Sequence, residues 1–161
     1  LTATQRFGSP AVTNNGAGVF QAVTGAYSVG DNLAQWNFDF YIGGTGLRNY
    51  SYKLFGDYSA TVGDAEGTFA DISAYLGLPD SLTTPGTSQN SENLGFGTNL
   101  AQFDPGVAGQ YGFILAAYDQ TGGEVGRSAI LVNVGQVPEP GSLALVGLAL
   151  AGLATVRRRK A

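Results

Sequence analysis

The sequence predicts an all-β chain, an antiparallel β-sandwich followed by a short apolar C-terminal helix. Three observations support this fold class. The 161 residues include 25 glycines and 6 prolines, which favour turns. Several short segments alternate between apolar and polar residues, as half-buried strands do. Because no helical segments alternate with these strands, βαβ units are not expected. We expect residues 1–136 to form the sandwich domain and residues 137–161 to form a separate C-terminal segment.

The clearest strand spans Gln35–Ile42, where every second residue from Trp36 onward is large and apolar. A second alternating segment, Asn49–Phe55, follows a glycine-rich turn at residues 43–46, so we expect the two strands to form an antiparallel pair. Val19–Thr24 predicts a weaker strand. Thr68–Leu76 is the candidate helix of the body, and Leu78–Asn99 is rich in small polar and breaker residues that predict a long surface excursion.

The best-defined supersecondary element is a hairpin near the end of the body. Gly109–Asp119 and Glu124–Val134 both alternate, and the glycine-containing turn at residues 120–123 joins them. The preceding Asp104–Gln110 resembles the approach to the penultimate strand of immunoglobulin-like and related sandwiches. That resemblance implies that the Tyr111 hydroxyl forms a hydrogen bond with the backbone of a preceding residue. The alternative is that Tyr111 is simply an aromatic residue of the core. An immunoglobulin-like and a jelly-roll-like sandwich both remain open.

The absence of certain residue types excludes several classes of function. The chain has no Cys, His or Met, so zinc fingers, imidazole or thiolate metal sites, Ser/His/Asp triads and disulfides are excluded. Residues 1–136 contain four basic and eleven acidic residues, a net charge of −7. Because this charge repels phosphate backbones, we expect no nucleic-acid partner, and the composition implies no cofactor.

The C-terminal region differs sharply from the body in composition. Residues 141–156 contain no charge, and they lie between Pro138-Glu139-Pro140 and a basic block. The block consists of Arg157, Arg158, Arg159 and Lys160. Sixteen helical residues would span about 24 Å, somewhat less than the ~30 Å hydrocarbon core, so the segment predicts a marginal transmembrane helix with the basic block as its cytoplasmic stop. A buried C-terminal helix is the alternative.

These features together resemble the bacterial PEP-CTERM sorting signal. The residues that carry the resemblance are Val137, Pro138, Glu139 and Pro140, the apolar segment and the basic block. It implies a protein exported by a Gram-negative bacterium, held transiently in the inner membrane, processed by an exosortase near Pro138-Glu139-Pro140, and delivered to the cell surface or to an extracellular, biofilm-type polysaccharide matrix. Since the sequence starts at Leu1, an upstream export signal would not be seen.

The body adds a second, less specific resemblance. Gln89–Phe96 and the hairpin ending at Asn133-Val134 are similar to other exported proteins that bear this tail, and the resemblance implies no function for the body.

Carboxylates are the acid/base groups that remain for catalysis, and two of them could hydrolyse a glycoside. The candidates are Asp39, Asp57, Asp64, Glu66, Asp71, Asp104, Asp119 and Glu124. Their spacing singles out no pair. Four of them lie in a glycine-interrupted segment that could supply oxygen ligands to calcium, although solvated loop charges are favoured because the EF-hand spacing is missing. These four are Asp57, Asp64, Glu66 and Asp71.

Aromatic side chains could also stack on sugar rings. Trp36 is one candidate, although it shares a face with Phe38 and Phe40 and is expected in the core. Tyr41 and Phe55 are expected on the opposite faces and would be better placed if those faces are open. The favoured interpretation is a noncatalytic exported surface or matrix protein. A carbohydrate-binding module acting on extracellular polysaccharide and a small carboxylate-dependent hydrolase are the alternatives.

Overall fold

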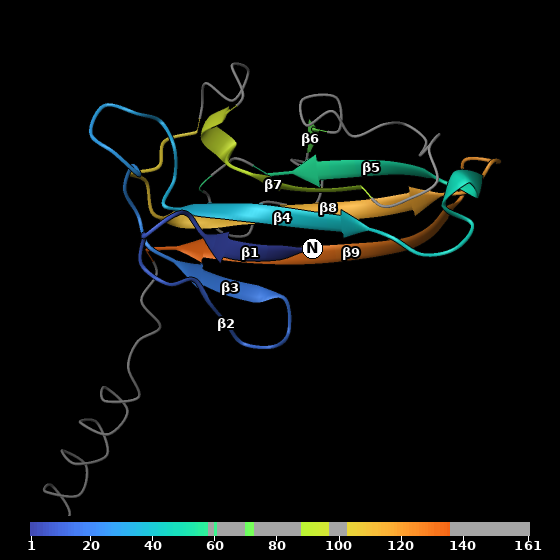
Figure 1. Ribbon diagram of the computed structural model, residues 1–161, viewed down its shortest axis with the longest axis horizontal. Coiled ribbons are helices and arrows are strands. Elements are labelled where there is room, and N and C mark those ends of the chain that lie inside the picture. Colours follow the sequence, from blue (N-terminus) through green and yellow to red (C-terminus); the bar gives the residue numbers. More distant parts are fainter. Residues whose placement is uncertain (58–59, 61–69, 73–87, 97–102, 136–161) are drawn as a thin grey trace, which may run out of the picture.

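The computed structural model describes residues 1–57, 60, 70–72, 88–96 and 103–135, and within them the chain is all-β (Figure 1). Three strands form one sheet in the order β1 (Thr2–Gln5), β4 (Trp36–Ile42) and β7 (Ser88–Glu92). Six strands form a second sheet in the order β2 (Thr13–Asn14), β3 (Val19–Ala22), β9 (Glu124–Val134), β8 (Gly109–Tyr118), β5 (Ser51–Gly56) and β6 (Ala70–Asp71). Two short 3₁₀ helices, η1 (Leu47–Asn49) and η3 (Leu94–Phe96), lie between strands.

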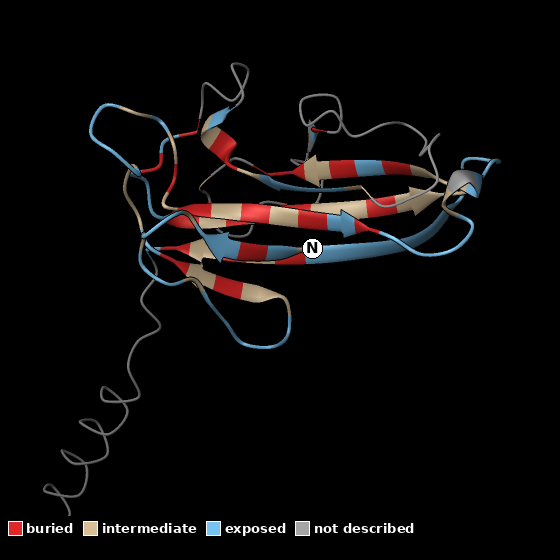
Figure 2. Cartoon of the chain, in the orientation of Figure 1, coloured by how far each residue is buried: buried red, intermediate tan, exposed pale blue. Residues whose placement is uncertain are grey.

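The facing sides of the two sheets share one hydrophobic core. Buried and partly exposed residues alternate along β4, so that its large apolar residues point inward (Figure 2). The rings of Phe38 and Phe113 stack across the sheets with centroids 4.2 Å apart, and Trp36 lies 5.7 Å from Tyr111. Burial of these aromatic faces is the main favourable contribution to the packing of the two sheets.

The predicted hairpin is confirmed. β8 and β9 pair antiparallel from Gly109 opposite Val134 to Tyr118 opposite Glu124, with a register shift at Ala117/Tyr118. The Asp119–Gly123 loop closes on itself, because the Asp119 amide donates to the Gly123 carbonyl at 2.9 Å. Gly122 has a φ of 84°, a conformation that a glycine adopts without steric cost.

The predicted pairing of Gln35–Ile42 with Asn49–Phe55 is wrong. β4 pairs with β1 and β7, whereas β5 pairs with β8 and β6 in the other sheet. Both strands carry an apolar face, and residues 43–50 with η1 carry the chain from one sheet to the other. The two apolar faces therefore pack against each other across the core, which buries more apolar surface than a flat hairpin would.

Three smaller expectations also need correction. One pair is parallel rather than antiparallel, since β3 runs alongside β9 with Val19 opposite Leu131. Ala70-Asp71 lies in a strand, not in the predicted helix, and the rest of Thr68–Leu76, apart from Ile72, lies outside the described residues. Within the predicted surface excursion, Ser88–Glu92 forms β7, because its backbone completes the edge of the three-stranded sheet. Residues 78–87 and 97–99 are outside the description.

The strands give the body two distinct ends (Figure 1). At the exit end, which we define by Gly135 and the ends of β1, β3 and β9, the Gly135 amide donates to the Ala22 carbonyl at 2.9 Å. At the hairpin end, defined by the Asp119–Gly123 loop, β8 turns into β9. All described strands are complete by Val134, so residues 136–161 follow directly from the exit end of the body.

Candidate ligand-binding surfaces

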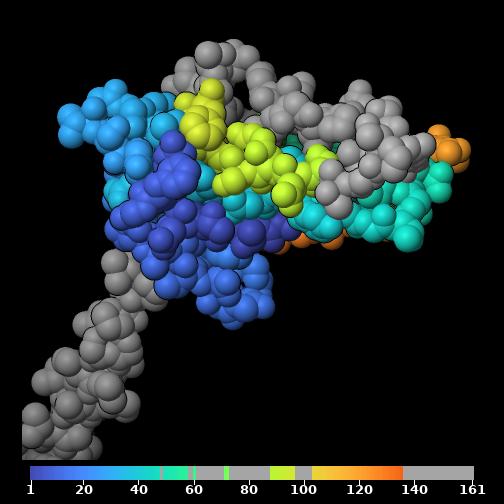
Figure 3. All heavy atoms as spheres, in the orientation of Figure 1, coloured from blue at the N-terminus to red at the C-terminus, as the bar shows by residue number. Residues whose placement is uncertain are grey.

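The outer side of the three-stranded sheet presents polar side chains and one aromatic ring to solvent. We call it the polar face, and it consists of Thr2, Thr4, Asn37, Asp39, Tyr41, Gln89 and Ser91. Neighbouring strands are joined across it, since Thr4 Oγ1 donates to Asp39 Oδ2 at 2.9 Å and Asn37 Nδ2 donates to Ser91 Oγ at 3.0 Å. The outward sides of β1 and β7 lie on the surface in view in Figure 3.

Tyr41 is the aromatic member of the polar face, and its side chain is 60% exposed. Its ring lies over Gly43, where an added Cβ would collide with the phenol. Glycine at this position therefore lets the ring lie against the strand with one face free. A sugar ring stacks on an aromatic face of this kind, while neighbouring hydroxyl, amide and carboxylate groups can hydrogen-bond its hydroxyls.

The other two aromatic candidates lie differently. Trp36 is 2% exposed between the sheets, as the alternation of β4 predicted, so its indole faces the core and offers no surface to a sugar. Phe55 is half-buried on the side of β5 opposite Tyr52 and Leu54. Of the three, the structure places Tyr41 at an open surface.

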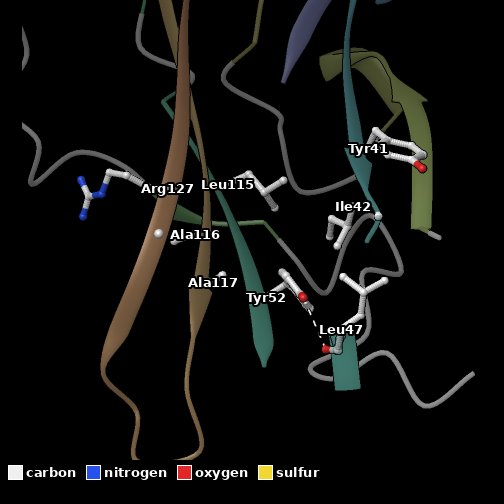
Figure 4. Close-up of a pocket in the computed structure, with 10 residues that line it drawn as sticks. Tyr41, Ile42, Leu47, Tyr52, Leu115, Ala116, Ala117 and Arg127 are labelled. Atoms are coloured by element: carbon white, nitrogen blue, oxygen red, sulfur yellow. Dashed lines mark hydrogen bonds between the residues drawn. The ribbon is translucent and has the colours of Figure 1, made fainter. Parts of the chain in front are cut away.

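A cavity of about 250 Å³ opens near the hairpin end, between β4, β5, β8 and β9 (Figure 4). Ile42, Leu47, Tyr52 and Leu115 contribute apolar surface, and the Tyr52 hydroxyl donates to the Leu47 carbonyl at 3.3 Å. Burial raises the pKa of Tyr52. Tyr41 and Arg127 also line the cavity, but in Figure 4 the ring of Tyr41 and the guanidinium of Arg127 both point away from the other lining residues. The Arg127 guanidinium pairs with Glu124 at 2.7 Å. Among the described residues that line the cavity there is no carboxylate.

The acidic residues predicted for calcium are only partly within the described residues. Asp57 is buried beside the core, and its backbone amide donates to the Gly112 carbonyl at 2.9 Å. Asp71 forms an ion pair with Lys53 at 3.3 Å. Asp64 and Glu66 lie outside the description. Across residues 1–57, 60, 70–72, 88–96 and 103–135, no three His, Cys, Asp or Glu side chains come together as a metal site.

Tyr111 behaves as the predicted corner tyrosine and also as a core aromatic. Its ring is fully buried, and its hydroxyl donates to the carbonyl of Val107, four residues upstream, at 3.3 Å. Burial, with the nearby charges of Asp104 and Asp57, raises the pKa of Tyr111. The side chain thus fixes the loop that leads into β8.

Sequence reasoning missed Asn93, a buried polar side chain at the exit end. Its Nδ2 lies 3.0 Å from the Ala34 carbonyl, 2.8 Å from the Trp36 carbonyl and 2.9 Å from Asn37 Oδ1. Its Oδ1 accepts from the Ala34 amide at 2.9 Å and from the Gly95 amide at 3.1 Å. Asn93 lies within the segment that resembles other exported proteins, but nothing in its neighbours signals burial.

Sequence reasoning also missed a group of side chains that we call the Arg6 cluster: Arg6, Phe7, Tyr27 and Phe96. The Arg6 guanidinium carbon lies 5.6 Å, 4.9 Å and 5.1 Å from the ring centroids of Phe7, Tyr27 and Phe96, respectively. These rings come from three separate segments, so only the folded chain brings them together. Each contact is of the cation–π type.

No helix in the part of the chain that the structure describes is long and apolar enough to cross a membrane. The apolar segment 141–156, the Pro-Glu-Pro residues and the basic block all lie outside that part. The C-terminal helix and the residue roles predicted there therefore stay predictions.

Comparison with known proteins assigns the C-terminal region but not the body. Residues 136–160 match the family model described as the PEP-CTERM protein-sorting motif. No curated protein and no solved structure matches the chain. The Pro-Glu-Pro residues, the uncharged segment and the basic block fall within the matched range, as the sequence predicted. The chain therefore carries a PEP-CTERM protein-sorting motif at residues 136–160 and is a substrate for exosortase-dependent sorting.

Proposed function

We propose that this protein is a noncatalytic component of the cell surface or extracellular matrix, exported and then released by an exosortase near Pro138-Glu139-Pro140. The sorting motif is the observation that carries the proposal. In the precursor, residues 141–156 hold the chain in the inner membrane and the basic block stays on the cytoplasmic side. We also propose that the body is a β-sandwich of the immunoglobulin-like or the jelly-roll-like type.

The position of the motif supports processing without damage to the body. β9 ends at Val134, and Pro138 comes only four residues later. Cleavage near Pro138 would remove no described strand. The lack of Cys and His in the sequence supports a role that does not depend on the commonest nucleophiles and bases.

Intact-mass measurement of protein recovered from the native host tests this proposal. We expect most exported molecules to end near Pro138, and we expect a variant with Glu139→Ala to keep the full C-terminal mass. A variant with Glu92→Ala, an acid outside the motif, serves as the matched control and should be processed normally. The proposal fails if Ala161 is present on most exported wild-type molecules.

A second candidate function is carbohydrate binding, and the polar face favours it. Tyr41 offers an open ring on an exposed sheet, with Gln89 opposite it on β7 and Asp39 two residues before it on β4 as neighbouring hydrogen-bonding groups. A flat, largely uncharged surface of this type suits a neutral polysaccharide chain. Each sugar can stack or form hydrogen bonds there, and few charged groups of the protein have to give up their bound water.

Electrophoresis of the purified chain through gels that contain polysaccharide tests this candidate. Retention of the wild-type chain should be lost in Tyr41→Ala and weakened in Gly43→Ala, because the new methyl group displaces the ring. Phe7→Ala, which removes an exposed ring at the other end of the body, should retain the wild-type mobility shift. Absence of retention for the wild-type chain on all extracellular polysaccharides of the host would count against binding.

A further inference from the structure

The Arg6 cluster is an exposed aromatic surface around a cation that has no ion-pair partner in the part of the chain that the structure describes. Phe7 is 77% exposed, Phe96 51% and Tyr27 40%. Among the described residues Arg6 forms no ion pair, and its Nε is buried without a hydrogen-bond partner. Asp31 is close enough for the charge of Arg6 to help lower its pKa, although a hydrogen bond from Ser28 is the larger cause. The guanidinium is therefore held by rings and remains available to an anion.

The cluster lies at the exit end, next to the point where the sorting motif begins. The Arg6 amide donates to the Gln35 carbonyl at 2.9 Å, and Gln35 Nε2 donates to the Thr24 carbonyl at 3.0 Å. Thr24 in turn packs against Gly135. A Cβ added to Gly135 would lie only 2.6 Å from Cγ2 of Thr24. In Figure 1, β1 and β9 both point to this end, and the loop between β3 and β4 projects beyond it.

The chain between the body and the apolar segment is short. Five residues, 136–140, separate Gly135 from Gly141. Gly135 and Gly141 are thus six residue steps apart, which is at most about 22 Å in a fully extended chain. While residues 141–156 are in the membrane, the exit end must therefore stay within about that distance of the lipid surface. The hairpin end lies at the far end of the strands and is not constrained in this way.

We propose that the Arg6 cluster docks the body of the precursor onto the headgroup layer of the inner membrane; this inference rests on the membrane anchoring of the proposed function. Aromatic rings are stable at the boundary between headgroups and acyl chains, and a guanidinium binds lipid phosphate through several N–H donors. Val29, which is fully exposed in the projecting loop between β3 and β4, adds apolar surface at the same end.

The distribution of charge supports lipid phosphate as the partner of this surface. The other described cations with placed side chains, Lys53 and Arg127, are paired with Asp71 and Glu124. Because residues 1–136 carry a net charge of −7, most of the body is repelled by an anionic surface. Arg6 is surrounded by rings and forms no ion pair with any described residue, so it gives the exit end a local preference for headgroups that the described parts of the hairpin end lack.

The test uses the full chain, anchored by its own tail in nanodiscs of phosphatidylethanolamine and phosphatidylglycerol. The chain has no native cysteine, so Ser9→Cys at the exit end and Gln120→Cys at the hairpin end each accept a single fluorophore. A quencher on the lipid headgroups should quench the label at position 9 more strongly than the label at position 120. Because the short linker by itself keeps position 9 nearer to the lipid than position 120, adding Arg6→Glu and Phe7→Ser should lower the excess quenching at position 9 to the smaller level that the linker alone produces.

Two readouts keep this inference separate from the anchoring on which it rests. Co-elution of the chain with nanodiscs reports the tail, and it should be the same with and without the Arg6→Glu and Phe7→Ser substitutions. A chain that co-elutes but shows equal quenching at both positions, or excess quenching that the substitutions leave unchanged, overturns the docking alone. A chain that does not co-elute overturns the anchoring and the docking together. Val29→Ser, an exposed change that leaves the cluster intact, should reduce the excess quenching without affecting the near-ultraviolet signal of Trp36.

Discussion

The exit end and the hairpin end of the body are held together by different kinds of contact. At the exit end, Asn93 reaches backbone groups of Ala34 and Trp36, which are 59 and 57 residues away, from a buried position. At the hairpin end, Asp119 bonds Thr121 and Gly123, which are two and four residues away and exposed. Buried polar contacts have no competing water, so their loss leaves unsatisfied groups, whereas exposed contacts are readily replaced by solvent.

This difference indicates which end sets the stability of the fold. We expect substitutions at the exit end to be costly, because each one disturbs segments that are far apart along the chain. We expect substitutions at the hairpin end to change local properties with little effect on global unfolding. Four predictions test this comparison, from the largest effect to the smallest.

The largest effect is expected for Asn93→Leu. Leucine has a similar volume but leaves the Ala34 amide and the Ala34 and Trp36 carbonyls without their partner, so the free energy of unfolding should fall by about 3 kcal/mol. Urea unfolding followed by Trp36 fluorescence measures it. Asn90→Ala, an exposed asparagine in the adjoining strand, should change stability by less than about 0.5 kcal/mol. Similar values for the two variants would remove the distinction between the ends.

Gly95→Ala should have the next largest effect. An alanine Cβ at this position would collide with the backbone carbonyl of Asn32, and backbone yields less readily than a side-chain tip, so we expect a loss of about 1–3 kcal/mol. Gly126→Ala is the matched control in β9, where a Cβ meets no atom within 4 Å. It should stabilise the chain by about 0.4–1 kcal/mol through the unfolded state. Shifts of the urea midpoint in the same direction would contradict this prediction.

Tyr111→Phe should cost about 1 kcal/mol, because it removes the hydroxyl that binds the Val107 carbonyl but keeps the buried ring. The pH dependence gives a second readout. Because the pKa of Tyr111 is raised in the folded state, the unfolded chain ionises first as the pH rises above the ordinary tyrosine value of about 10, and stability falls. The variant should lose less stability over that alkaline range than the wild type. An unchanged alkaline slope would show that Tyr111 does not contribute to it.

The smallest effect is expected at Asp119. Its Oδ1 accepts from the Thr121 hydroxyl at 2.7 Å, and this hydrogen bond is the main cause of its lowered pKa. Thr121→Ala should move the pKa of Asp119 up toward the ordinary aspartate value of about 3.9, as measured by NMR titration. Because the folded pKa is lowered, the stabilising contribution is present above the ordinary value and is lost as the pH falls through the folded value. A cooperative loss of the whole fold in Thr121→Ala at neutral pH would argue against local control of this end.

The candidate surfaces differ in how far the sequence could predict them. Alternation along β4 placed Trp36 inward and Tyr41 outward, because side chains of a strand point to alternate faces. It could not show that Gln89 lies opposite Tyr41, or that Thr2 and Ser91 flank Asp39, on one open sheet, since that depends on the pairing of β4 with β1 and β7. The Arg6 cluster was likewise hidden, because Arg6, Tyr27 and Phe96 lie in segments that are far apart along the chain.

The sequence by itself determined the features that depend on neighbouring residues. The sorting motif at residues 136–160, the hairpin of β8 and β9 and the inward face of β4 all follow from local spacing, glycine positions and alternation. Only the tertiary structure decided that β4 and β5 belong to different sheets, that β3 pairs parallel with β9, and that Asn93 is buried. These outcomes depend on which distant segments bury the most apolar surface while satisfying most buried polar groups, and that balance is set by the whole chain at once.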